Sequence, residues 1–367
     1  MADHLTVGIE EEFHVADAAS RMLSDDSDTV LAGVTHERFA PDQFASEIYL
    51  SMVETVSVVC ETLDQVRAQL TALRGELCTT ARAHGLRVLA SGTMPLTPRR
   101  EQRITPGERY QRIERVHQHV SREMMACGTH VHVGVPDREE AVQVLNHVRG
   151  RLAPLLALSA NSPYWDRRDS GFASYRTVLW GRWPSAALPE LFRDAEEYDA
   201  VGRMLVESGA IVDLGQIYWD VRLSSAHPTV EFRVADVCLT VDDALVQAGL
   251  CRALVRSCLE RVRRGEAPPR PRPEALRAAK WRAARFGLEE RLFDPLRGTL
   301  RPAAELIGAW LDELRPALEA EGDWEQISDL VGRLLRDGSG AARQRAAFAT
   351  AGRLEDTIDL IALGTCA

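Results

Sequence analysis

The segment TVGIEEEF, residues 6–13, places three consecutive glutamates inside the first apolar stretch of the chain. Glutamate is a poor strand former, so a block of three in a strand-like pattern needs an explanation. Side chains alternate between the two faces of a strand, which puts Glu11 on the apolar face and puts Glu10 and Glu12 together on the other. The Cα atoms of Glu10 and Glu12 are then about 6.6 Å apart, and each carboxylate raises the pKa of the other unless a cation lies between them. The pattern predicts a cation-binding face, and it leaves open whether Glu11 has a buried partner or reaches solvent.

Two later stretches repeat this division between an apolar and a polar face. In GTHVHVGV the valines share one face of the predicted strand, and His130 and His132 share the other. In TVEFRVADV the apolar side chains lie opposite Glu231 and Arg233. Three predicted strands therefore each carry acid, imidazole or guanidinium groups on one face. Lysine is absent from all three faces, whereas ordinary solvated strand faces mix lysine with glutamate.

A further acidic pair, Glu47 and Glu54, lies in the segment SEIYLSMVE. On a helix this spacing brings both side chains to one face, and across a strand-to-helix turn they would also converge. Each acidic pattern has a simpler interpretation, as a solvated strand face, a satisfied histidine pair or cross-strand ion pairs. We favour a common site because the pattern recurs, and because carboxylates with a few arginines are what a Mg²⁺-phosphate site needs.

The composition limits the classes of function. The chain has 367 residues and a net charge of −10, which disfavours nucleic acid and anionic membranes as partners. No apolar window is long enough to span a bilayer, and the first residues lack a secretory signal pattern, so we expect a cytoplasmic protein. Lys280 is the only lysine, which excludes a P-loop and a protein-kinase lysine. Any phosphate must therefore be bound by arginines, metal ions and backbone amides.

The cysteine content predicts reduced thiols. The number of cysteines is odd and no CxxC pair occurs, a pattern that favours free thiols over a disulfide framework. The cysteines are Cys60, Cys78, Cys127, Cys238, Cys251, Cys258 and Cys366.

Hydrophobic periodicity predicts an α+β fold with a largely antiparallel sheet. The predicted strands are 5–15, 85–93, 128–135, 217–224 and 229–237. The predicted helices are 61–84, 107–126, one after the cap at Asp137, 189–208, one after Thr240, and most of 273–363. The proline-rich segment 265–275 predicts a surface linker, but we do not expect it to be a domain boundary. The chain is expected to form one domain over residues 1–367.

Several motifs, in this order along the chain, resemble those of the glutamate–cysteine ligase type 2 family, the YbdK-like carboxylate–amine ligases. The motifs are TVGIEEEF, SMVET, CGTHVHVGV, LLALSANSPYW, SYRTVLWGRWP, YWDVR and TVEFRVADV. The resemblance implies a fold similar to the catalytic domain of glutamine synthetase, with a curved antiparallel sheet and helices outside it. It also implies ligation of a carboxylate to an amine with ATP and two or three Mg²⁺ ions, with Mn²⁺ as an alternative. The type activity joins the γ-carboxylate of glutamate to cysteine through an acyl phosphate, and we expect a homodimer acting on ATP and amino acids.

The resemblance further implies roles for individual residues. The expected metal ligands are Glu10, Glu12, Glu47, Glu54, His130 and Glu231. The residues expected to act directly in catalysis are Glu54 and Arg233. The expected substrate or ATP contacts are Arg176, Arg222 and His132. The base that deprotonates the amine stays open between phosphate itself and a carboxylate.

Two other functions remain as alternatives. A metal-dependent hydrolase would use His130 and His132, but the remaining histidines lie on predicted helices outside an HExxH-like arrangement. A catalytically weak ATP-binding homologue would keep the site without turnover. One cluster of aromatic residues is expected to belong mainly to the core, although it would also suit adenine stacking or a substrate pocket. The cluster comprises Trp165, Trp180, Trp183, Tyr218 and Trp219.

Overall fold

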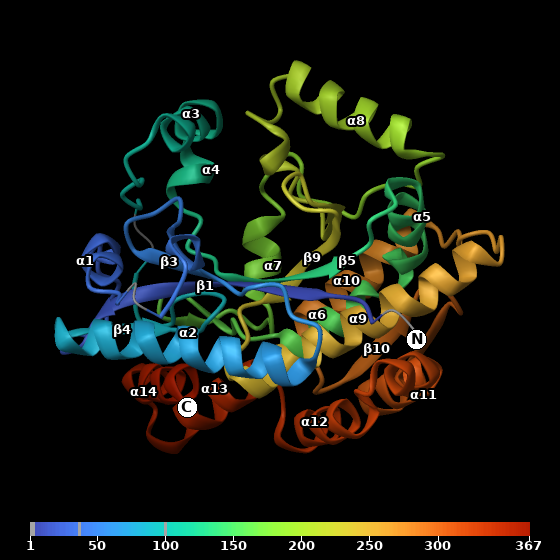
Figure 1. Cartoon of the computed structure of the whole chain (residues 1–367). Coiled ribbons are helices and arrows are strands. Elements are labelled where there is room, and N and C mark those ends of the chain that lie inside the picture. Colours follow the sequence, from blue (N-terminus) through green and yellow to red (C-terminus); the bar gives the residue numbers. More distant parts are fainter. Residues whose placement is uncertain (1–3, 36–37, 99–100) are drawn as a thin grey trace.

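The computed structural model describes residues 4–35, 38–98 and 101–367, and these form a seven-stranded sheet with helices on both sides (Figure 1). The strand order is β2-β3-β1-β5-β9-β8, with β4 paired to the end of β1, and each of the pairings described between these strands is antiparallel. The strands are β1 (Val7–Asp17), β2 (Phe44–Ser46), β3 (Met52–Val56), β4 (Leu86–Leu89), β5 (Gly128–Gly134), β8 (Val221–Leu223) and β9 (Thr229–Asp236). The predicted α+β class with an antiparallel sheet is confirmed.

Helices cover both faces of this sheet (Figure 1). Helix α2 and the C-terminal helices lie on one side, and α3, α4 and α8 rise from the other. The helices in the first half of the chain are α1 (Ser27–Ala32), α2 (Leu63–Ala83), α3 (Glu108–His117), α4 (His119–Arg122), α5 (Arg138–Val148), α6 (Leu152–Ser159) and α7 (Tyr175–Trp180). The later helices are α8 (Ala195–Glu207), α9 (Val241–Arg263), α10 (Pro273–Phe286), α11 (Ala303–Glu321), α12 (Trp324–Asp337), α13 (Gly340–Ala351) and α14 (Leu354–Cys366). Short 3₁₀ turns are η1 (Pro41–Gln43), η2 (Arg149–Arg151) and η3 (Leu214–Gln216). None of the helices in the described ranges has the length and apolar character needed to cross a membrane.

Local sequence signals explain the helix starts. The Thr62 hydroxyl accepts a hydrogen bond from the Gln65 N–H and caps α2. The Asp137 side chain caps α5 in the same way, through the Glu140 N–H, as the sequence predicts. The apolar stripe of α2 is buried against the sheet, which is the burial expected for leucines and valines at helical spacing. The residues of this stripe are Leu63, Val66, Leu70, Leu73 and Leu77.

Some local predictions differ from the structure. The helix predicted over 107–126 is broken at Gln118, whose φ of 49° lies outside the helical region, so that α3 and α4 are separate. Residues 189–194 precede α8 rather than forming part of it. Glu47 and Glu54 do not share a helix, because β2 and β3 form an antiparallel pair in this segment. Most of 273–363 is helical, as predicted, and a hairpin of β10 (Arg291–Asp294) and β11 (Thr299–Pro302) lies between α10 and α11.

The partner of Glu11 is Arg74 on α2. The Arg74 guanidinium donates to both Glu11 oxygens, at 2.6 and 2.9 Å, and also to the carbonyl oxygens of Cys238 and Leu239. Both side chains are almost fully buried. Glu11 therefore joins the apolar side of the sheet to α2 and lies on the opposite face from Glu10 and Glu12.

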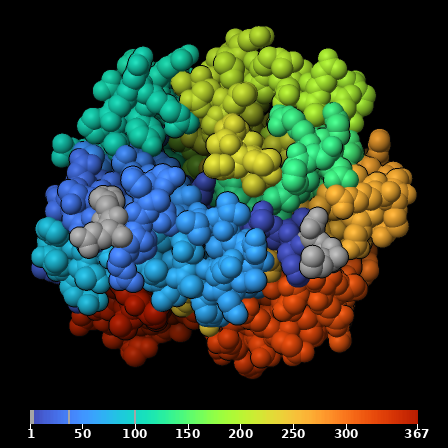
Figure 2. All heavy atoms as spheres, in the orientation of Figure 1, coloured from blue at the N-terminus to red at the C-terminus, as the bar shows by residue number. Residues whose placement is uncertain are grey.

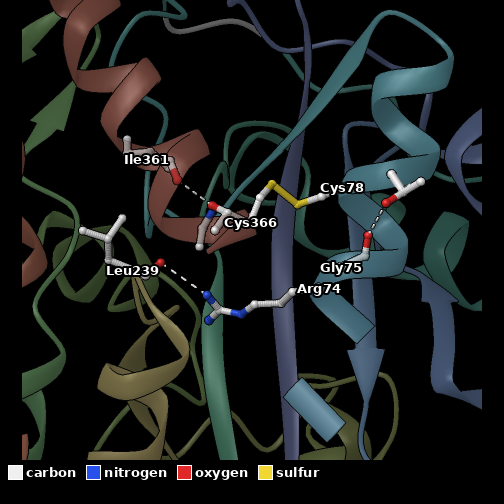
Figure 3. The surroundings of a disulfide bond; sticks show 9 residues. Arg74, Gly75, Cys78, Leu239, Ile361 and Cys366 are labelled. Carbon is white, nitrogen blue, oxygen red and sulfur yellow. Dashed lines mark hydrogen bonds between the residues drawn. A yellow bond between two sulfur atoms is a disulfide. The ribbon is translucent and has the colours of Figure 1, made fainter. Parts of the chain in front are cut away.

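A disulfide corrects the prediction that all cysteines are reduced. Cys78 on α2 and Cys366 on α14 are bonded, with their Cα atoms 5.9 Å apart and 288 residues between them in sequence (Figure 3). Figure 3 also shows Arg74 one turn before Cys78, reaching toward the Leu239 carbonyl. The other cysteines of the described residues are free and buried. The pairing depends on the packing of α14 beside α2, and the spacing of cysteines in the sequence does not predict that packing.

Candidate functional site

A cavity of about 210 Å³ lies on the polar face of the sheet, where the predicted acidic residues meet. Its floor carries Glu10 and Glu12 from β1, Glu54 from β3 and His130 from β5, and Glu47 reaches it from the segment after β2. Figure 2 shows the surface hollowed between the teal segment around α3 and α4 and the yellow-green segments opposite it. The cavity therefore collects carboxylates from three separate parts of the chain.

Strand register explains this convergence. Glu12 lies directly opposite Glu54 on β3, and Glu10 lies opposite His130 on β5. Further across the sheet, Glu231 on β9 is the register partner of both His132 and Arg222. Directly opposed residues have Cβ atoms about 4.5–5.5 Å apart, so antiparallel pairing turns the separate motifs into one continuous polar row.

Three groups within this row bring ligand atoms within 4.8 Å of one another. The groups are Glu12 with Glu47 and Glu54, Glu10 with Glu54 and His130, and Glu10 with His132 and Glu231. The first group is composed of carboxylates alone, the oxygen ligands that Mg²⁺ and Mn²⁺ favour. All six residues predicted as metal ligands are members of at least one group, and His132 joins them.

Burial and mutual repulsion raise the pKa values of three carboxylates in this row. Burial raises the pKa of Glu12 to about 7, with a further contribution from the negative charge of Glu47. Burial also raises the pKa of Glu47, and it raises that of Glu54 well above the usual range, where Glu10 adds to the effect. A divalent cation would offset these repulsions, because an opposite charge favours the ionised carboxylates.

Glu10 is in a different environment from Glu12. Burial alone would raise its pKa, but contacts with His130 and His132 outweigh burial and hold it well below the usual value. One Glu10 oxygen lies 3.1 Å from Nδ1 of His130, and the other lies 3.2 Å from Nε2 of His132. Nε2 of His130 is buried without a hydrogen-bond partner among the described residues, and it lies 3.8 Å from a Glu12 oxygen. A buried, unpartnered nitrogen beside carboxylates fits a metal ligand.

Two arginines line the cavity beside this row. Arg222 donates to both oxygens of Glu231, at 2.7 and 3.0 Å, and Arg233 also bonds to Glu231. Although burial opposes ionisation of Glu231, the charges of Arg233 and Arg222 hold its pKa well below the usual range. Glu231 therefore already has two cationic partners, and a metal ion there would have to share it with them.

Arg176, predicted as a substrate clamp, lies behind the cavity. It is 2% exposed and is not among the described residues that line the cavity wall. Its guanidinium donates to the Arg233 carbonyl at 3.3 Å and packs over the ring of Trp180. A Cβ atom added to Gly128 would lie 2.4 Å from it, so Gly128 permits this close approach. The Arg176 charge also opposes the burial-driven rise in the pKa of Glu12. His132 likewise stays off the wall, with Nδ1 2.9 Å from the Thr229 hydroxyl.

Aromatic side chains also line the cavity, in agreement with the pocket alternative left open for part of the aromatic cluster. Tyr110, Trp180, Trp183 and Tyr218 line the cavity. Trp183 is also a buried member of the core, and Trp180 and Tyr218 pack against that core, so the expected core role holds as well. Trp219, by contrast, is buried in the core as expected. Arg109 on α3 also lines the cavity, and its place in an ordinary amphipathic helix gave no sign of this. Helical periodicity identifies a buried side of α3, but not the cavity that this side faces.

Comparisons with known proteins agree with the fold and identify the family. The model of the family "Glutamate-cysteine ligase family 2 (GCS2)" matches residues 6–359. A Frankia alni protein named "Putative glutamate–cysteine ligase 2-2" is 42% identical over 97% of this chain and 96% of its own length. A relative of the same name from Mycobacterium sp. (strain KMS) is 43% identical over the full length of both chains. The Frankia alni relative 2-3 is also 43% identical, but this chain spans only 41% of its length.

Solved structures show the same fold at low sequence identity. The Francisella tularensis glutamate–cysteine ligase in complex with AMP has a TM-score of 0.69 and 12% identity, covering 99% of this chain and 88% of that one. A bifunctional glutathione synthetase from Pasteurella multocida has a TM-score of 0.70 and 14% identity, covering 99% of this chain and 52% of that one. The family match together with the fold defines the chain as an ATP-dependent ligase. The chain belongs to glutamate–cysteine ligase family 2.

Proposed function

We propose that this protein uses ATP and Mg²⁺ to join a carboxylate to an amine, with the γ-carboxylate of glutamate and the amine of cysteine as the leading pair. The observation that carries the proposal is the meeting of Glu12, Glu47 and Glu54 in one cavity that three arginines also line. In the proposed reaction the substrate carboxylate attacks the γ-phosphorus of ATP, which gives an acyl phosphate and ADP. The amine then attacks the acyl carbon, loses a proton and releases phosphate.

The proposed metal ligands are the members of the three carboxylate and histidine groups. Mg²⁺ bound there would neutralise the triphosphate and polarise its γ-phosphoryl group. Glu12, Glu47 and Glu54 would hold one ion, and Glu10 with the histidines and Glu231 would hold another. Mn²⁺ suits the same oxygen-rich ligands, and this donor set has no thiolate that would favour a softer metal.

The arginines are proposed to bind the charge that metal ions leave uncompensated. Arg233 and Arg222 line the cavity and are fixed in place by Glu231. Because arginine presents a rigid fork of donors, a fixed arginine can bind a phosphoryl or carboxylate oxygen without reorganising. Arg176 is proposed to act from behind the wall, on the position of Arg233 and the charge of Glu12, rather than by touching substrate.

Two further parts of the proposal concern the domain organisation and the assembly. The GCS2 model covers residues 6–359, which supports a single ligase domain over the chain. A homodimer is the proposed assembly, and sedimentation velocity at micromolar protein concentration tests it through the measured mass.

The test is ADP release with Mg²⁺, ATP, glutamate and a panel of amines that includes cysteine. Glu12→Gln should lower kcat by about a hundredfold or more, because the amide supplies no charge to a metal at the centre of the carboxylate group. Glu319→Gln, in an exposed ion pair on α11, is the control and should leave kcat unchanged. The melting temperature of Glu12→Gln should not fall, since the substitution removes a buried and poorly compensated carboxylate.

The outcomes separate the candidate functions. Near-normal turnover by Glu12→Gln would exclude the metal assignment. ATP binding without ADP release for any substrate pair would favour a catalytically weak homologue. Hydrolytic activity with Zn²⁺ and without ATP would favour a metal-dependent hydrolase that uses His130 and His132.

A further inference from the structure

An ion pair spans the mouth of the cavity. Arg109 extends from α3, and Asp213 precedes η3 on the opposite side. The Arg109 Nε donates to one Asp213 oxygen at 2.7 Å, and Nη2 donates to the other at 3.1 Å. Arg109 and Gly215 both line the cavity, so the fork of Arg109 meets a carboxylate at the edge of the proposed site.

Gly215 leaves the space that the paired guanidinium and carboxylate occupy. A Cβ atom at Gly215 would lie 2.9 Å from Arg109 Nη2 and 2.9 Å from an Asp213 oxygen. A larger residue at this position would therefore displace one of the two partners. The observed two-point contact shows that the position accepts a planar carboxylate in the paired geometry that arginine favours.

Arg109 differs in exposure from the other cavity arginines of the described chain. Its side chain is 48% exposed, compared with 11% for Arg222 and 7% for Arg233. Arg222 and Arg233 are committed to Glu231, which is almost fully buried. Breaking a buried pair leaves an uncompensated charge, whereas an exposed pair contributes only about 0–1 kcal/mol. Of these three arginines, Arg109 is the one that a ligand from solvent can take over at low cost.

We propose that Arg109 binds the non-reacting α-carboxylate of an amino-acid substrate, which replaces Asp213 as the partner of the guanidinium. This inference rests on the proposed ligase function and names a recognition element for its substrate. The glutamates inside the cavity repel a carboxylate that no metal ion compensates. The non-reacting α-carboxylate is therefore better held at the edge of the cavity, while the reacting group points inward toward the proposed metal ions. Asp213 keeps Arg109 extended and in position until substrate arrives.

The proposal distinguishes a carboxylate anchor from a phosphate anchor. An α-carboxylate anchor favours glutamate over γ-aminobutyrate, or cysteine over cysteamine, since each second compound lacks only the α-carboxylate. A phosphate anchor would instead act on ATP. The observed partner of Arg109 is a carboxylate, which is why the amino acid is the chosen ligand.

Equilibrium binding tests the proposal without requiring turnover. The tryptophans in the cavity wall report binding through intrinsic fluorescence, with calorimetry as a second readout. The full-length wild type with Mg²⁺ and a non-hydrolysable ATP analogue should bind one amino acid about tenfold or more tighter than its decarboxylated analogue. Arg109→Gln should bring this ratio to within about twofold of one, because the amide carries no charge to select the carboxylate.

Two further variants complete the experiment. Arg112→Gln changes an exposed arginine on the same helix and should keep the wild-type ratio. Asp213→Asn removes the competing carboxylate and should bind the amino acid at least as tightly as the wild type does. In turnover assays Arg109→Gln should raise KM for that amino acid, with little change in KM for ATP.

The inference fails if Arg109→Gln keeps the preference for the α-carboxylate, or if the wild type shows no such preference for either amino acid. It also fails if Arg109→Gln loses as much affinity for ATP as it loses for the amino acid. A wild type that binds glutamate with the predicted preference but releases no ADP with any amine would instead overturn the proposed ligation alone. The two proposals therefore fail by different measurements.

Discussion

Replacing Glu11 tests how the sheet is joined to its helices. Glu11→Gln keeps the shape of the side chain but removes its charge, leaving the Arg74 guanidinium without a counter-ion. The exposed fractions of Arg74 and Glu11 are 2% and 0%, so water cannot replace the lost carboxylate. Removing one partner of a buried pair costs about 3–5 kcal/mol, and we expect a loss in this range.

A control in the same chain shows what burial contributes. Arg315 and Glu319 form a 2.7 Å pair whose side chains are 54% and 49% exposed, so Glu319→Gln should cost about 0–1 kcal/mol. The double variant Glu11→Gln/Arg74→Met should lose less than the sum of the single losses, because the unpaired charge is gone. It should not return to wild-type stability, because the Cys238 and Leu239 carbonyls lose their donor.

Urea unfolding followed by far-UV circular dichroism and tryptophan fluorescence measures these losses. The expected order of stability is wild type, then Glu319→Gln, and then Glu11→Gln well below both. A Glu11→Gln protein as stable as Glu319→Gln would refute the reasoning, since it would show that Arg74 finds solvent or another partner. A double variant whose loss equals the sum of the single losses would refute the pairing itself.

Two other predictions concern stability. Cys366→Ser should lower the unfolding free energy by about 2–4 kcal/mol and should make the melting temperature insensitive to dithiothreitol. A wild-type melting temperature that is equally insensitive to dithiothreitol would contradict the disulfide. Burial lowers the pKa of the His14 imidazole to about 3 from its usual 6.5, so the unfolded state binds the proton first and stability falls as the pH drops below 6.5 toward 3. Measured in EDTA, the free energy of unfolding of the wild type should fall between pH 7 and pH 5 by about 2 kcal/mol more than that of His14→Leu. Parallel pH profiles of the two proteins would exclude this account.

Much of the site could be predicted because strand alternation is a local property. Within each strand, alternation alone puts Glu10 and Glu12 on one face, and His130 and His132 on one face. That these two polar faces lie on the same side of the sheet follows from the pairing of β1 with β5, and the sequence supported it only through the recurrence of the pattern. The residue types then indicated hard cations and phosphate. The register that sets Glu12 opposite Glu54 was not available, because it depends on how β1 and β3 pair.

The parts that were missed depend on segments that pack together from distant positions. Arg109 and Tyr110 line the cavity because α3 folds over the sheet, and the amphipathic pattern of a helix does not identify the surface that the helix will cover. The family resemblance implies a direct substrate contact for Arg176, but its burial behind Gly128 follows from tertiary packing.

The segment TVGIEEEF contains both kinds of information. The sequence by itself separates Glu10 and Glu12 from Glu11, since a period of two is imposed by the strand backbone. Only the tertiary structure decides that Glu11 meets Arg74, 63 residues away, and that Cys78 meets Cys366 across 288 residues. These partners are chosen by helix packing on the sheet, where the free energy of burial depends on which groups finally meet rather than on their spacing in the chain.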